Sequence, residues 1–492
     1  MSKTYILAID QGTTSSRAML YNARLQVVGR GQFEFKQYFP ANGYVEHDPE
    51  EIWQTTLQAC RQALTDANVQ AHDVAGIGIT NQRETSVVWD LKTGKPIHRA
   101  IVWQDRRTAE QCRQLQQANH EPWVQKRTGL LLDPYFSATK VAWMLDHVKG
   151  ARARAEAGEL AFGTIDCFLL WRLTKGQVHA TDATNASRTQ LMNLSSRQWD
   201  SELCELFAVP MAMLPSIEDN AHHFGVADSS WLGADIPITA MIGDQQGALV
   251  GQACLEPGHI KSTYGTGCFA LVNTGQEQVH SEHRLLTTLG YQLNGQPTYA
   301  LEGSIFMAGA IVQWLRDKLG IIQTAAETER LAEGVPCDQS ELLIPAFTGL
   351  GAPYWDPDAR AAIFGMTRDT GKKQLAAAAL RSVALQTRDL LQAMVEDGQT
   401  IETVKVDGGM TDNGWFMQAL ADITGYTVLR ADTAEITARG TAFLAGLEVG
   451  LFKQLHDLQQ LCRTKGTFSA EITSNERDKL YQRWLAAVAK VR

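Results

Sequence analysis

The chain has 492 residues, of which 44% are hydrophobic and 20% charged, and its formal net charge is −9. This length exceeds what one ordinary core accommodates, so we expect two large domains. The acidic balance, without a basic tail or stripe, argues against nucleic acid as the main partner. It leaves phosphorylated ligands open, because these bind through local donors.

No apolar run approaches the roughly 18 residues that a membrane span needs. The first ten residues carry no signal-peptide pattern. The eight cysteines are scattered, and none forms a CxxC pair or a zinc-finger spacing. These features are typical of a reduced cytosol, so we expect a cytoplasmic protein without a membrane span.

The chain opens with an apolar run at residues 5–10 that ends in Asp10. Residues 16–35 alternate between apolar and polar, as successive hairpin strands do. Residues 48–68 begin with Asp-Pro, carry acids in the first turn and space their apolar residues as a helix does. Residues 74–80 are typical of a buried strand. Strands alternating with helices indicate an α/β fold.

The order of strand, acid and small polar turn returns later in the chain. Residues 237–244 form an apolar run that ends in Asp244. Two strand-like pieces then surround a Gly-Thr-Gly turn at 265–267, and residues 403–425 place Asp407 and two glycines between a strand and a helix.

These echoes suggest two related halves that face a shared cleft. No low-complexity linker separates the halves. We predict an N-terminal domain over residues 1–248 and a C-terminal domain over residues 249–492.

The turn after residue 10 reads DQGTTSSR, and the chain contains no P-loop, dinucleotide-binding or protein-kinase motif. Phosphate would therefore bind backbone N–H groups and the hydroxyls of Thr13, Thr14 and Ser15, with Arg17 adding a charge-assisted fork. Asp10 beside phosphates requires an intervening cation, and Mg²⁺ favours such a site. The alternative is a polar hairpin that Asp10 caps, and the turn alone does not decide between them.

The later turns leave similar alternatives open. The turn at 265–267 is either a close backbone approach to a ligand or a plain glycine hairpin. Asn413 either serves a ribose or base, or caps the helix that follows it. Several polar or aromatic residues stand at the ends of expected strands or helices, where a surface, core or cap role is equally open: Arg83, Glu84, Trp103, Tyr135, Asp244 and Gln245.

Taken together, the motifs resemble the FGGY family of carbohydrate kinases over essentially the whole chain. They include DQGTTSSR, NQRET, DPYFS, GDQQ, STYGTGCF and VDGGMTDN, in that order. Within the family, NQRET with DPYFS and GDQQ is similar to the branch that acts on glycerol. The resemblance implies two ribonuclease-H-like α/β domains of the actin-like ATPase fold that close on a cleft. It also implies ATP-dependent phosphorylation of glycerol to sn-glycerol 3-phosphate in glycerol catabolism, with release of ADP.

The resemblance further implies the site. Asp244 is expected as the general base, and Asp10 and Asp244 are expected to face Mg²⁺ directly or through water. The nucleotide is expected at Thr13, Thr14, Ser15, Arg17, Thr266, Gly309, Gln313, Gly409 and Asn413. Glycerol is expected at Arg83, Glu84, Trp103, Tyr135, Asp244, Gln245 and Phe269. A homodimer or homotetramer is also implied.

The chain departs from some family members in one loop. Those members bind fructose 1,6-bisphosphate through a Gly-Thr-Arg sequence, where this chain has Ala234 and Asp235. We therefore expect weak or absent inhibition through that site. His222 and His223 do not match the histidine that is phosphorylated in other members. The alternatives in function are a kinase of another small polyol or sugar, and a non-catalytic nucleotide-binding relative.

Overall fold

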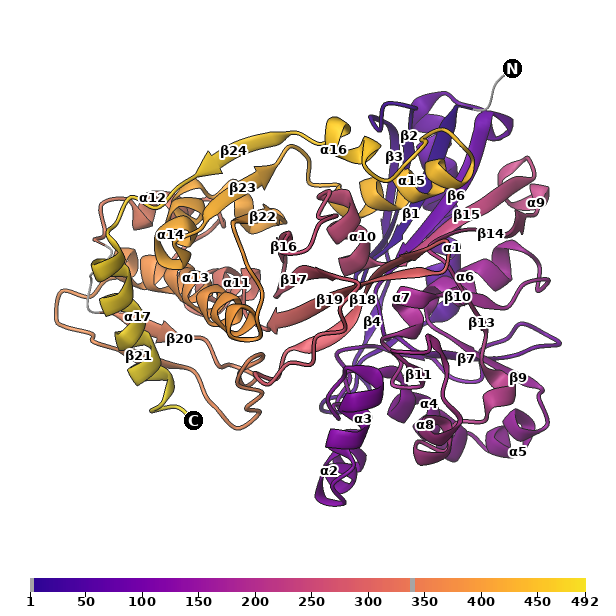
Figure 1. Ribbon diagram of the computed structural model, residues 1–492, viewed down its shortest axis with the longest axis horizontal. Coiled ribbons are helices and arrows are strands. Elements are labelled where there is room, and N and C mark those ends of the chain that lie inside the picture. The colour runs from indigo at the N-terminus through magenta and orange to yellow at the C-terminus, as the bar shows by residue number, and fades with distance from the viewer. Residues whose placement is uncertain (1–3, 337–340) are drawn as a thin grey trace.

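The computed structural model describes residues 4–336 and 341–492, so that Cys337 lies outside the described residues. The chain forms two lobes that lie side by side, each with a mixed β-sheet and covering helices (Figure 1). The seven other cysteines are free within the described ranges. No helix in these ranges is both long enough and apolar enough to cross a membrane.

The first sheet has six strands among the described residues, in the order β14-β15-β6-β1-β2-β3. The strands are β1 (Tyr5–Gln11), β2 (Ser15–Tyr21), β3 (Val27–Glu34), β6 (Val74–Asn81), β14 (Ala221–Ala227) and β15 (Ile236–Gly243). β1, β2 and β3 pair antiparallel, as the alternation predicts, whereas β6 runs parallel to both β1 and β15.

The second sheet has seven strands within the described ranges, in the order β18-β19-β17-β16-β22-β23-β24. They are β16 (Ile260–Tyr264), β17 (Cys268–Gly275), β18 (Leu286–Leu293), β19 (Gln296–Ile305), β22 (Thr403–Asp407), β23 (Thr427–Ala431) and β24 (Thr464–Phe468). β16 and β17 form an antiparallel hairpin, and β22 runs parallel to β16. Apart from β18, the order and directions repeat those of the first sheet, which accounts for the echoes in the sequence.

Helices cover both faces of the first sheet. One face packs against α1 (Pro49–Ala67) and α6 (Ile165–Leu173), in a core that includes Trp53 and Phe168. Asp48 caps α1, as its sequence predicts. The other face packs against α15 (Ile436–Glu448), which approaches closely because a Cβ on Gly78 would lie 2.8 Å from the Thr441 side chain.

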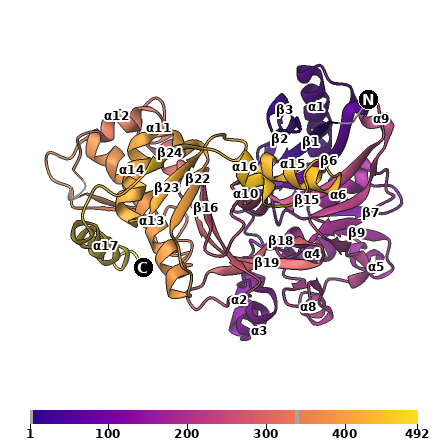
Figure 2. The same ribbon diagram turned by 45° about the horizontal axis from the view of Figure 1, so that its top comes forward.

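The helix α10 (Asp244–Gly251) contacts α15 and also strands of the second sheet, so it lies between the two sheets. Both views place α15 and α16 (Asp457–Leu461) against the N-terminal lobe, although they follow the second sheet's strand β23 in the chain (Figures 1 and 2). The two halves of the sequence are therefore interleaved at this seam. The division between residues 248 and 249 stays a prediction.

A second group of helices covers the second sheet on its outer side. These are α11 (Gly309–Asp317), α12 (Glu327–Ala332), α13 (Lys372–Glu396), α14 (Gly414–Thr424) and α17 (Ser474–Val488). The smaller helices of the N-terminal lobe are α2 (Ala109–Gln117), α3 (Glu121–Thr128), α4 (Ser137–His147), α5 (Ala151–Glu156), α7 (Ala183–Ala186), α8 (Ser201–Leu206) and α9 (Ser229–Leu232).

The remaining elements are short. The strands are β4 (Gln37–Tyr38), β5 (Glu46–His47), β7 (Val87–Asp90), β8 (Ala100–Ile101), β9 (Leu160–Gly163), β10 (Ala180–Asp182), β11 (Met192–Asn193), β12 (Gln198–Trp199), β13 (Ser216–Glu218), β20 (Leu342–Ile344) and β21 (Ala362–Phe364). The 3₁₀ turns are η1 (Ala71–Asp73), η2 (Met211–Met213) and η3 (Gly409–Asp412).

Candidate active site

Four buried charged side chains form a network at the end of β6. Arg83 donates to Glu302 at 2.5 and 3.1 Å, and Arg188 donates to Glu302 at 2.8 Å and to Glu84 at 2.7 Å. Each of the four side chains is at most 1% exposed. Each carboxylate thus faces a guanidinium, which is the condition under which buried charges are tolerated.

The network controls the charge of its members. Burial alone would raise the pKa of Glu302, but Arg188 and Arg83 outweigh it and lower that pKa to about 2. For Glu84 burial wins over the two arginines and raises the pKa. Glu302 is therefore a fixed negative charge that holds Arg83, which also contacts Tyr135 and Asp244.

Three aromatic rings lie beside this network. The Trp103 ring is 5.7 Å from that of Tyr135 and 6.1 Å from that of Phe269, both edge-on. Arg83 donates to the Tyr135 hydroxyl at 3.4 Å, so the charged network and the aromatic wall meet at Tyr135. The indole N–H of Trp103 donates to Thr13 Oγ1 at 3.0 Å, which ties the wall to the turn after β1.

Asp244 is the first residue of α10 and lies 3.3 Å from Arg83 Nε. Its side chain is 29% exposed, unlike the closed network behind it. Burial raises the pKa of its carboxyl, and the charges of Arg83 and Lys261 offset part of that effect. The next residue, Gln245, accepts a hydrogen bond of 2.5 Å from the buried Lys261 ammonium.

The turn between β1 and β2 places Asp10 opposite Arg17 in the strand register, and their side chains form an ion pair. Arg17 also lies 3.4 Å from Glu435, next to the start of α15. Burial raises the pKa of Asp10, whereas Arg17 lowers it. Arg17 therefore has carboxylate partners in this structure, and its expected contact with phosphate stays a prediction.

The rest of that turn presents small donors. Gly12 N donates to Ser15 O at 2.9 Å and closes the turn. Thr14 is exposed, and Thr13 is half-buried beneath Trp103. Ser15 is buried and its hydroxyl accepts from Gln32. Of the three hydroxyl residues, Thr13 and Thr14 are thus the ones open to a ligand.

A separate pocket of ≈ 480 Å³ lies between the second sheet and its helices, within the roughly 300–1,000 Å³ typical of small-molecule sites. Five expected nucleotide residues line it together: Thr266, Gly309, Gln313, Gly409 and Asn413. A Cβ on Gly409 would meet nothing within 4 Å, so the backbone is open to the pocket there. Asn413 caps α14 by accepting from Phe416 N at 2.9 Å, and it also lines the pocket, so its expected contact with the nucleotide stays a prediction.

The hairpin β16–β17 joins the two groups of residues. Its turn at 265–267 contributes to the pocket, while its strands carry Lys261 and Phe269 toward the charged network. Gly309 packs directly on this turn, because a Cβ there would lie 2.6 Å from Gly265 O.

Sequence reasoning missed four charged residues of the site: Arg188, Lys261, Glu302 and Glu435. Glu302 and Lys261 left a signal, since each is a single charge inside an apolar strand. Arg188 stands in the family-like segment TDATNASRT without a predicted role. Nothing local marks Glu435 as a partner of Arg17.

The carboxylates Asp10 and Asp244 fit what Mg²⁺ requires. Mg²⁺ in phosphoryl-transfer sites takes one or two carboxylates, with phosphate oxygens and water completing its shell. Within residues 4–336 and 341–492 no group of three or more His, Cys, Asp or Glu side chains is placed to hold an ion alone. The two carboxyls influence one another, because the charge of Asp10 contributes to the raised pKa of Asp244.

The loop that differs from bisphosphate-binding relatives is self-contained. Asp235 accepts from Ser229 N at 2.8 Å at the start of the short helix α9, and Gly233 has φ +97°. The Asp235 carboxylate thus stabilises the start of α9 through this hydrogen bond. The expected absence of bisphosphate inhibition stays a prediction.

Comparisons with known proteins identify the family to which the chain belongs. Models of the FGGY family of carbohydrate kinases match residues 5–251 (N-terminal domain) and 260–449 (C-terminal domain). The chain is 58% identical to Glycerol kinase 1 of Pseudomonas aeruginosa, over 99% of both chains. It is 57% identical to the glycerol kinase of Ectopseudomonas mendocina, over 100% of this chain and 99% of that one.

Among solved structures, the chain is similar to Plasmodium falciparum glycerol kinase with ADP. The TM-score is 0.94 at 37% sequence identity, and the match covers 100% of this chain and 98% of that one. The expected two-domain α/β fold of the actin-like ATPase type is thereby confirmed.

Proposed function

Because the chain belongs to the FGGY family of carbohydrate kinases, we propose that it transfers the γ-phosphoryl group of ATP to a terminal hydroxyl of glycerol. The products are sn-glycerol 3-phosphate and ADP, as glycerol catabolism requires. The observation that carries the proposal is the buried network of Arg83, Glu84, Arg188 and Glu302 beside Asp244.

The network suits a very small polyol. Three carbons offer little apolar area, so selectivity comes from directed hydrogen bonds that leave site groups unpaired when a hydroxyl is missing. Arg83 donates and Glu84 accepts, while Gln245 supplies an amide that Lys261 holds in place. Trp103 and Phe269 cover the carbon atoms, and Tyr135 adds a hydroxyl at the edge.

Asp244 is the general base in this proposal. Its carboxyl is partly exposed and is held 3.3 Å from Arg83, beside the residues assigned to glycerol. Burial raises its pKa, which makes the carboxylate a better proton acceptor than an ordinary aspartate. As the glycerol oxygen forms its bond to the γ-phosphorus, its proton passes to Asp244, and the bond between that phosphorus and the leaving oxygen of ADP breaks.

Thr13, Thr14 and the turn at Thr266 act on the phosphates from the two hairpins, while Gly309, Gln313, Gly409 and Asn413 line the nucleotide pocket. Asp10 and Asp244 would hold Mg²⁺, directly or through water. When bound, the ion neutralises charge that develops on the transferred group. Arg17 and Ser15 support the turn that carries these donors.

Two further expectations accompany the proposal. We place the enzyme in the cytoplasm and expect a homodimer or homotetramer, as the family resemblance implies. Fractionation of its source cells and light scattering of the purified chain test these expectations.

An ADP-release assay with a panel of polyols and sugars tests the function directly. We expect kcat/KM for glycerol to exceed that for tetritols and ketopentoses by at least about a hundredfold. A larger acceptor cannot align its hydroxyls with Arg83, Glu84 and Gln245 together, and each buried group left unpaired costs on the order of 1–3 kcal/mol. A higher kcat/KM for another polyol or sugar would mean that this compound, and not glycerol, is the substrate. Failure to release ADP with any acceptor would favour a non-catalytic nucleotide-binding protein.

A further inference from the structure

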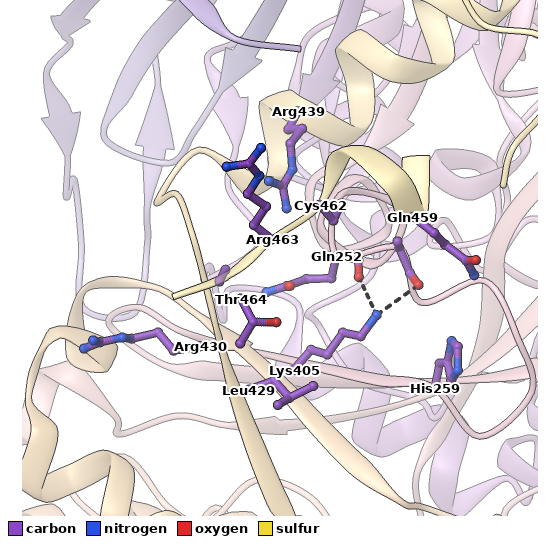
Figure 3. A pocket seen from close by; sticks show the side chains of 12 residues that line it. Gln252, His259, Lys405, Leu429, Arg430, Arg439, Gln459, Cys462, Arg463 and Thr464 are labelled. Carbon is purple, nitrogen blue, oxygen red and sulfur yellow. Dashed lines mark hydrogen bonds between the residues drawn. The ribbon is translucent and has the colours of Figure 1, made fainter. Parts of the chain in front are cut away.

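A second pocket, of ≈ 300 Å³, lies away from the residues assigned to glycerol and ATP. It is at the lower end of the roughly 300–1,000 Å³ typical of small-molecule sites. Its walls come from the C-terminal end of α10, from β22, β23 and α15, and from the segment that joins α16 to β24 (Figure 3).

The charge of the lining is one-sided. Lys405, Arg430, Arg439 and Arg463 line the pocket, His259 stands at its edge, and none of the lining residues is acidic. The chain as a whole carries a net charge of −9, so this concentration of cations runs against its average. Cations gathered in a concave site favour an anionic ligand.

Part of this charge already has a structural use. The Lys405 ammonium donates to Gln252 O at 2.8 Å and to Ala253 O at 3.1 Å, just after the end of α10. Arg439 donates to Gly251 O at 2.8 Å. These cations therefore satisfy carbonyls at a helix C-terminus, where positive charge is stabilising.

The acids near the pocket neutralise only part of its charge. Asp432 pairs with Arg439 at 2.7 Å, and Asp407 accepts from the Gln252 amide. Glu256 is held by His456 at 2.8 Å. Within the ranges the structure describes, no hydrogen bond or ion pair engages the exposed Arg463 side chain.

The four cations do not contribute equally. Arg430 donates to Thr411 O, and Figure 3 shows its guanidinium turned away from Lys405. Arg463 lies on the Arg439 side of the pocket, with Lys405 below them in the same view. Arg463 is free in the described ranges, and Arg439 and Lys405 retain N–H groups beyond the bonds named above, because a guanidinium has five N–H donors and an ammonium three. Gln459 and Thr464 also line the pocket.

We propose that this pocket binds a small phosphomonoester. The phosphate dianion is held by Arg439, Arg463 and Lys405, since guanidinium forks match phosphate oxygens and lysine adds a point charge. The volume leaves room for a short polar carbon chain, and the polar residues Gln459 and Thr464 also line the pocket.

The position of the pocket gives such a ligand a structural effect. α15 packs on the first sheet, whereas β22, β23 and β24 belong to the second, so a bound anion ties the two lobes together. One wall is the end of α10, the helix that begins with Asp244. Another is α15, in which Arg439 stands one turn after Glu435, the partner of Arg17.

The test is titration calorimetry with the proposed substrate sites saturated by glycerol and a non-hydrolysable ATP analogue. The probes are glycerol 2-phosphate and inorganic phosphate, in roughly 0.15 M salt so that weak surface binding is screened. We expect glycerol 2-phosphate to bind at one site per chain. Arg463→Glu should weaken it at least about tenfold, because it replaces a charge-assisted donor by a repelling carboxylate.

Lys465→Glu is the matched control, since Lys465 is also exposed and follows Arg463 by two residues but does not line the pocket. The control should change the affinity less than about threefold. Equal weakening by both variants, or the absence of saturable binding, would overturn the proposal. Binding of inorganic phosphate without the ester would overturn the assignment to a phosphomonoester.

Discussion

The two lobes share one strand order but present opposite chemistry at equivalent places. In the β1–β2 hairpin Asp10 and Arg17 form an ion pair across the two strands, whereas the β16–β17 hairpin turns at Gly-Thr-Gly without a charge. The chain after β6 gives the buried Arg83 and Glu84, and the chain after β22 gives two glycines.

The two turns are also held differently. The first is fixed by a side chain, through the hydrogen bond from the Trp103 indole to Thr13. The second is fixed by backbone, because Thr266 O accepts from Ala308 N and Ala310 N at 3.0 Å. One scaffold thus holds one turn by a side chain and the other by backbone, which suits the proposed polyol site on one side and the proposed nucleotide site on the other.

The largest expected effect is on Asp244. Asp244→Asn removes the proposed base and should lower kcat by about 10²–10⁴-fold, a larger factor than the change in glycerol or nucleotide binding, because the amide keeps the shape of the side chain. In the unaltered protein, burial raises the pKa of Asp244 above its ordinary value of 3.8. Protonation of Asp244 removes the base, so kcat/KM should fall as the pH drops through that raised pKa. Stopped-flow rates and calorimetry of both ligands measure this. Near-full kcat with normal binding would exclude Asp244 as the base.

Glu302 should matter next, and through stability. Glu302→Gln leaves Arg83 and Arg188 without their shared carboxylate, so the free energy of unfolding should fall by about 3–5 kcal/mol. The folded pKa of about 2 is below the ordinary value of 4.5, so the stabilisation is present above pH 4.5 and is lost as pH falls toward 2. Denaturant unfolding measures both effects. The control is Glu277→Gln, because Glu277 is exposed, and it should change the free energy of unfolding by less than about 0.5 kcal/mol. If the two variants destabilised the protein equally, the proposed role of the network would be contradicted.

Trp103 should give the smallest effect. Trp103→Phe keeps an aromatic wall but removes the donor to Thr13, and KM for ATP should rise only about threefold to tenfold. A double-mutant cycle with Thr13→Val isolates that bond, because the second change should add little once the first is made. Full additivity would mean that the indole does not position the turn.

Much of the fold could be predicted from local pattern. The alternation of residues 16–35 predicted the hairpins β1-β2-β3, and Asp48-Pro49 marked the start of α1. The repeated strand-acid-turn order indicated two related halves, although Asp244 begins a helix rather than a turn between strands. The crossing of α15 onto the first sheet was not predictable, since it depends on glycines of β6 that lie far away in the chain.

The site divides in the same way. Residues in distinctive short motifs, such as Arg83, Tyr135 and Asp244, could be found from the sequence, and the structure brings them together. Arg188 and Glu302 could not be found from the sequence, because their role depends on an ion pair between positions more than a hundred residues apart. Spacing along the chain carries no signal for such a pair.

The central claim is that glycerol binds beside the charged network at Arg83 and Tyr135, and that the nucleotide binds in the pocket of the second lobe. Calorimetry of glycerol and of a non-hydrolysable ATP analogue, on Tyr135→Phe and Gly409→Val, tests it most directly. Gly409→Val projects into open space, so it should weaken the nucleotide about tenfold or more and leave glycerol unchanged. Tyr135→Phe should weaken glycerol about twofold to tenfold and leave the nucleotide unchanged. Equal weakening of both ligands by either variant would contradict the account.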